Sequence, residues 1–175
     1  MYKRQDQSYF LYSLTQGELS RALFPVGELI PDAPPGPILD LSGRVLGTHR
    51  GLPHYTVGQR RGLGLSSPEP LYVVALDPER NALIVGPESA LYSQGLVATE
   101  LHWIAGAPPG KTFRCQVQIR YRAAPVEAEV RLEGETARVE FEKPARAVAP
   151  GQAAVFYLGE RVLGGGVIAR SFPAR

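Results

Sequence analysis

The chain has 175 residues, a hydrophobic fraction of 44%, a charged fraction of 21% and a formal net charge of +2, values that exclude a disordered or collagen-like protein. The single cysteine excludes an internal disulfide framework and fits a cytosolic compartment, and the three scattered histidines offer no metal-ligand spacing. With no apolar run of membrane-spanning length and no signal core, we expect a cytoplasmic protein that makes no membrane contact and holds no metal.

The sequence of the N-terminal segment predicts one helix followed by a linker. Thr15 and Glu18 form a capping-box pattern ahead of apolar residues, and Pro25 ends the helix. Residues 30–37 contain four prolines and one glycine, a composition that removes hydrogen-bond donors. We therefore expect no regular structure there. The high glycine and proline content elsewhere indicates many turns between short strands.

Short strands are predicted after this linker, at residues 44–46, 71–76 and 82–85. The last two are separated by the turn-rich residues 77–81, which have the length of a hairpin connection. This unit should end near Ser93. The pattern indicates a small β-rich central domain.

The C-terminal part alternates most clearly. Apolar residues occupy every odd position of 113–122, and 126–133 and 138–142 alternate in the same way, so three strands in a meander are predicted, with facing charges on the first two. Residues 95–104, 153–157 and 161–168 add three more strands. So many short strands with glycine-rich corners close most economically as a small barrel, which makes the fold class mainly β.

Two local motifs have both a functional and a structural interpretation. Gln59, Arg60 and Arg61 lie among three glycines, which suits either a phosphate-contacting loop or a glycine-rich turn with solvated arginines. Arg120 and Tyr121 are neighbours on the long predicted strand and should point to opposite faces. They form either an RNA-contacting pair or a core tyrosine beside a solvated arginine.

Cysteine and histidine chemistry is not indicated. Cys115 should point inward between Phe113 and Val117, where a packed, inert thiol is expected rather than a nucleophile. His49 and His54 have no serine or carboxylate arrangement that would complete a catalytic set. No catalytic residue is therefore assigned.

Several ordered motifs resemble the tRNA-specific 2-thiouridylase family. They include DQSYFLY at 6–12, LFPVGEL at 23–29, YTVGQRRGLG at 55–64, IRYR at 119–122, PARAVAPGQ at 144–152 and LGGGVI at 163–168. The resemblance implies three parts. Residues 1–30 would be a helical remnant of an ATP-pyrophosphatase-type catalytic domain, 31–93 a central domain, and 94–175 a β-barrel similar to those of translation factors.

The family reaction is ATP-dependent sulfur transfer to C2 of the wobble uridine 34 of tRNAs for Lys, Glu and Gln. The family's Ser-Gly-Gly-x-Asp-Ser loop and both of its catalytic cysteines are missing from this sequence, through a late start and an internal loss near Ile30. A gene fragment is one explanation. We expect a partial enzyme, inactive alone and without a cofactor, whereas the full-length family uses ATP and a sulfur-relay protein or cysteine desulfurase system.

The resemblance also implies tRNA-binding residues. The family's Lys-Asp-Gln near the target base matches Asp6 and Gln7, with Gln5 in place of the lysine. The Arg-Tyr pair matches Arg120 and Tyr121, and the Pro-Gly-Gln turn matches Gln152. Two other functions remain open: a stand-alone β-barrel adaptor that binds a protein partner, and a hydrolase or transferase that uses Cys115.

Overall fold

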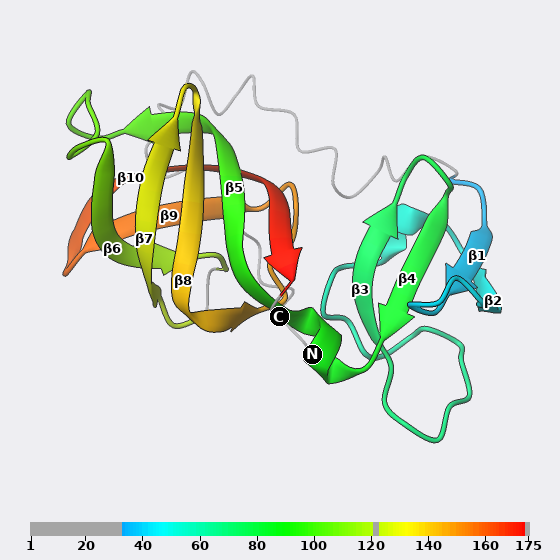
Figure 1. Ribbon diagram of the computed structural model, residues 1–175. Coiled ribbons are helices and arrows are strands. Elements are labelled where there is room, and N and C mark those ends of the chain that lie inside the picture. The colour runs from blue at the N-terminus through cyan, green and yellow to red at the C-terminus, as the bar shows by residue number, and fades with distance from the viewer. Residues whose placement is uncertain (1–32, 121–122, 174–175) are drawn as a thin grey trace, which may run out of the picture. The chain divides into compact units, whose positions relative to one another are not determined.

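The computed structural model describes residues 33–120 and 123–173 (Figure 1). The helix predicted before Pro25 lies outside these residues, as do Asp6, Gln7 and Tyr121. None of the described helices has the length and apolar character needed to cross a membrane.

The first sheet, here called the central sheet, has four strands in the order β2-β1-β4-β3. They are β1 (Gly36–Leu39), β2 (Val45–His49), β3 (Tyr72–Asp77) and β4 (Ala82–Gly86). The predicted hairpin is confirmed, since β3 and β4 are antiparallel neighbours and Asn81 takes the left-handed conformation that such a turn requires, with a φ of 47°. The core of this sheet contains Ile38, Val73, Leu83 and Val85.

The expectation of no regular structure through residue 37 is wrong at its end, because β1 begins at Gly36. The strand is antiparallel to β2 and parallel to β4, and its pairing with β4 starts only at Ile38. Pro37 therefore lacks an N–H at a position where the ladder to β4 has not yet begun, which is where a strand tolerates proline.

Six further strands form a closed barrel in the order β10-β5-β8-β7-β6-β9, which confirms the predicted barrel and the mainly β fold class (Figure 1). Two 3-10 helices, η3 (Leu52–His54) and η4 (Glu88–Leu91), precede it. The barrel strands are β5 (Tyr92–Trp103), β6 (Thr112–Gln118), β7 (Val126–Glu133), β8 (Thr136–Arg146), β9 (Ala153–Leu158) and β10 (Arg161–Pro173).

Apolar side chains fill the barrel. They come from alternate positions of each strand, because successive side chains point to opposite faces. Val117, Val130, Val139 and Phe156 are fully buried inside it. The predicted facing of charges on the first two meander strands is confirmed by the register, in which Arg114 lies opposite Glu129.

Strand β6 is shorter than the predicted 113–122 and ends at Gln118. The chain turns there, because the side-chain amide of Gln118 donates to the Ala123 carbonyl at 3.0 Å and the Ala123 N–H donates to the Arg120 carbonyl at 3.1 Å. The expectation that Arg120 lies on this strand is therefore wrong. Arg120 lies in the bend after β6, so the alternation of the strand does not fix the direction of its side chain.

Candidate nucleic-acid interface

Three segments that carry predicted RNA-contacting residues meet where the central sheet contacts the barrel. They are residues 57–61, the bend at Arg120 and residues 146–152. The guanidinium Nη2 of Arg120 donates to the Val57 carbonyl at 2.6 Å, across 63 residues of sequence. Val57 and Ala149 belong to one buried apolar cluster together with Leu91 and Ala147. We call this region the junction.

Arg120 is only partly exposed, and its Nε atom is buried with no hydrogen-bond partner among the described residues. Burial, and secondarily the positive charge of Arg146, lowers the pKa of the Arg120 guanidinium. Arginine nevertheless stays protonated in proteins. The junction thus contains a partly desolvated cation whose described hydrogen bond is to a neutral carbonyl.

Gly58 allows the loop beside the central sheet to approach the barrel segment at Ala147 closely. Its φ is +86°, and a Cβ at this position would lie 2.9 Å from the Ala147 Cβ. The Gly58 N–H donates to the Val73 carbonyl at 2.7 Å, and the Val73 N–H donates to the Gln59 carbonyl at 2.9 Å. Any side chain here would combine a disfavoured backbone conformation with a steric clash. Residues 57–59 are therefore fixed between β3 and the barrel.

The adjoining loop presents two cations to solvent. The Gln59 Oε1 accepts the Thr56 N–H at 3.1 Å, and its Nε2 donates to the Arg61 carbonyl at 2.9 Å, so this amide organises the loop from within. Arg60 and Arg61 are exposed, and neither forms an ion pair with the residues the structure describes. Both guanidinium groups are available for phosphate oxygens.

Arg146, at the end of β8, contacts residues of η4 and β3, which precede the barrel in the chain. Its Nε lies 3.0 Å from the Glu88 Oε1, and its guanidinium lies over the Tyr72 ring at 5.5 Å from the ring centroid. The next residue, Ala147, has a φ of 56° and donates its N–H to the Leu91 carbonyl at 2.8 Å. Sequence reasoning did not single out Arg146 or Val57 as members of a site, and it gave Gly58 only as one of the three glycines around Arg60 and Arg61.

Gln152 follows in the same segment and is partly buried. Its N–H donates to the Ala149 carbonyl at 3.3 Å, and its carbonyl accepts the Ile168 N–H at 2.8 Å. The structure therefore fixes the backbone of Gln152 between β10 and the apolar cluster of the junction. Among the predicted tRNA-binding residues, Arg120, Gln152 and the 59–61 loop are described, and all belong to segments that meet here.

Cys115 lies in the barrel interior, as predicted, with 3% of its surface exposed. Burial, and secondarily the charge of Glu127, raises the pKa of its thiol to about 12. The thiolate that a nucleophile needs is therefore absent near neutral pH. His49 is also structural: its Nδ1 accepts the Gly51 N–H at 3.0 Å, so its Nε2 carries the proton that it donates to the Asn81 carbonyl at 2.9 Å.

We expect Cys115 to resist a thiol reagent at pH 8 while the protein is folded. In a concentration of guanidinium chloride that unfolds the protein, it should react completely and about as fast as a free cysteine. Absorbance with an aromatic disulfide reagent measures both rates. Rapid modification of the folded protein would contradict this assignment and would restore the hypothesis of an enzyme that uses Cys115.

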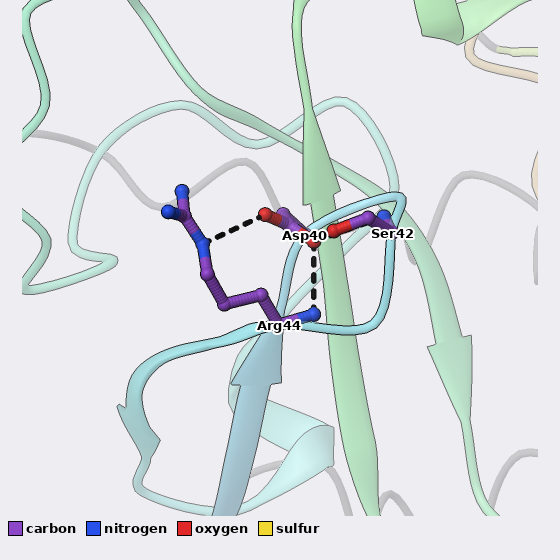
Figure 2. A network of polar contacts seen from close by, with 3 residues as sticks. All are labelled: Asp40, Ser42 and Arg44. Carbon is purple, nitrogen blue, oxygen red and sulfur yellow. Dashed lines mark hydrogen bonds and ion pairs between the residues drawn. The ribbon is translucent and has the colours of Figure 1, made fainter.

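A cavity of about 500 Å³ lies on the central sheet, and its lining includes Asp40, Ser42, Arg44, Leu65 and Leu71. Figure 2 shows the turn at its rim, where the Asp40 carboxylate accepts the Arg44 N–H at 3.0 Å and lies 3.2 Å from the Arg44 Nε. The Ser42 hydroxyl, and then the Arg44 N–H, lowers the pKa of Asp40. These polar groups satisfy one another, which is the arrangement of a structural turn. Within the described ranges no cluster of His, Cys, Asp and Glu could hold a metal.

A four-stranded mixed sheet followed by a closed six-stranded barrel is a two-part β architecture, and separate family models match its two parts. Residues 93–168 match an aminomethyltransferase beta-barrel domain, 26–87 a tRNA methyl transferase PRC-barrel domain, and 1–33 a tRNA methyl transferase HUP domain. Taken along the chain as 1–33, 26–87 and 93–168, the three matches together cover most of it.

Relatives identify the particular family. The tRNA-specific 2-thiouridylase of Chloroflexus aggregans is 49% identical over 208 residues, which cover 95% of this chain and 58% of the relative. Those of Symbiobacterium thermophilum and Magnetococcus marinus are 46% and 42% identical, covering 96% and 94% of this chain and 54% and 58% of the relatives. The chain belongs to the tRNA-specific 2-thiouridylase family, which confirms the resemblance stated from the motifs.

The chain spans a little over half the length of these relatives. The alignment with the Chloroflexus aggregans protein extends over 208 residues, more than the 175 of this chain, so that relative carries residues within the aligned region that this chain does not.

Proposed function

We propose that this chain is a tRNA-binding part of a 2-thiouridylase and that the junction is the surface that contacts the tRNA. The observation that carries the proposal is the hydrogen bond from Arg120 to the Val57 carbonyl, because it joins two segments in which RNA-contacting residues were predicted independently. Phosphate contacts position a protein on RNA, and the exposed Arg60 and Arg61 supply the charge for them.

On this proposal the described residues take no part in the sulfur-transfer chemistry itself. The family reaction needs reactive cysteines, whereas the one cysteine of this sequence, Cys115, is buried in the barrel. We assign no ATP-binding residue here. ATP, the sulfur-relay partner and thiolation of uridine 34 in tRNAs for Lys, Glu and Gln belong, on this proposal, to the full-length family enzyme.

Replacing Arg60 and Arg61 together by alanine should weaken binding of tRNA for Lys about tenfold, as expected for two solvent-exposed phosphate contacts. The slope of log affinity against log salt should fall by about 1 for each arginine removed. Fluorescence anisotropy over a salt series measures both quantities.

The matched control is the double variant Arg80→Ala and Arg131→Ala, which removes the same charge from exposed positions outside the three segments. It should bind tRNA within about twofold of the wild type, because distant exposed charges act only through screened long-range forces. Equal losses in the two double variants would disprove a specific junction surface. A protein partner that copurifies in the absence of tRNA would favour the adaptor function.

A further inference from the structure

We infer that Arg120 is a positioning residue, which holds the Val57–Gly58 turn against the barrel and so determines where Arg60 and Arg61 are presented. The inference rests on the proposed tRNA binding at the junction and goes beyond it, since it assigns Arg120 to the protein rather than to the RNA. Arg120 donates to the Val57 carbonyl at 2.6 Å, a short contact between a charged donor and a backbone acceptor.

The position of the guanidinium within the junction supports this assignment. An arginine that served only to contact phosphate would keep its donor fork in solvent, but the Nε of Arg120 is buried without a described partner. A Cβ added to Gly58 would lie 3.7 Å from both Nη1 and Nη2. The planar end of Arg120 is therefore packed on the backbone of the turn, and burial of a cation in this way is unfavourable unless its hydrogen bond is retained.

A continuous set of hydrogen bonds leads from Arg120 to the exposed arginines. Val57 accepts from Arg120, and the next residue, Gly58, donates to Val73 at 2.7 Å. Gln59 then accepts from Val73 through its carbonyl and donates through its side chain to the Arg61 carbonyl at 2.9 Å. Because Gly58 also lies against Ala147, displacement of the turn from the barrel would displace the whole loop.

Hydrogen exchange without RNA tests the positioning role directly. Arg120→Met keeps an unbranched apolar stem but removes the guanidinium group and, with it, all of the side-chain donors. The Gly58 and Gln59 amides should exchange about tenfold faster in this variant, since a charged hydrogen bond that restrains the turn is lost. Amides of the barrel interior, such as those of Val117 and Val139, should keep their wild-type rates. Unchanged exchange at Gly58 and Gln59 would overturn the inference.

A double-mutant cycle on tRNA affinity separates positioning from direct contact. If Arg120 acts through the turn, removal of Arg60 and Arg61 should cost about tenfold in the wild type but only about two- to threefold in Arg120→Met, because the loop is already misplaced. If Arg120 contacts RNA on its own, the losses should multiply, and the inference is wrong.

Gly58→Ala perturbs the same turn from the other side and serves as a second variant should Arg120→Met fail to fold. It should show the same faster exchange and the same non-additivity with the Arg60 and Arg61 substitutions; multiplicative losses here would also count against the inference. If the wild-type protein binds no tRNA, the proposed function fails, and the exchange rates alone then decide whether Arg120 positions the turn.

Discussion

Phe156→Ala is expected to lower the free energy of unfolding by about 3–5 kcal/mol, because it leaves a large cavity in the barrel. Phe156 is fully buried and lies at the centre of an aromatic group. Its ring is stacked on Trp103 with centroids 5.7 Å apart, and it meets Phe113 edge to face at 6.5 Å. Truncation removes both ring contacts together with the packing of the side chain.

Urea unfolding followed by tryptophan fluorescence measures this loss, because Trp103 is the only tryptophan in the chain. Leu158→Ala, two residues along the same strand, is the control, since that side chain is 62% exposed. Its effect should stay within about 0.5 kcal/mol. Similar effects of the two substitutions would show that the barrel interior is not packed as described.

Gly36→Ala is expected to destabilise the protein by about 3 kcal/mol, because the new methyl group would meet backbone rather than a movable side chain. A Cβ on Gly36 would lie 2.0 Å from the Asn81 carbonyl oxygen and 2.7 Å from the His49 Nε2. These are the two atoms joined by the partly buried hydrogen bond of His49. The substitution should therefore separate β1 from the β3–β4 turn.

Gly110→Ala provides the matched control, since the nearest atom to its added Cβ is 3.6 Å away, an ordinary van der Waals distance. Urea unfolding followed by circular dichroism should give nearly wild-type stability for this variant and a lower midpoint for Gly36→Ala. A wild-type midpoint for Gly36→Ala would contradict the close approach of Gly36 to Asn81.

The strands that could be predicted from sequence are those whose pattern repeats the physical geometry of a strand. Residues 126–133 alternate apolar and polar side chains, and β7 occupies that range. The 77–81 connection has the turn residues and length of a hairpin, and β3 and β4 form one. Such signals are local. Strand β1 has only four residues, of which two are glycine and proline, so it carries no clear strand pattern. Its partner β4 lies in a distant part of the chain.

Composition, alternation and ordered motifs were sufficient by themselves to determine the mainly β fold, the barrel and the family. Local sequence also indicated a buried, unreactive Cys115, because the alternation of its strand assigns it to the inner face. The tertiary structure alone decided what Arg120 contacts. Its partner, Val57, is 63 residues away, and the two come together only because β6 ends at Gln118 and the barrel closes against the central sheet. No local pattern encodes that contact, since it depends on packing between segments far apart in the chain.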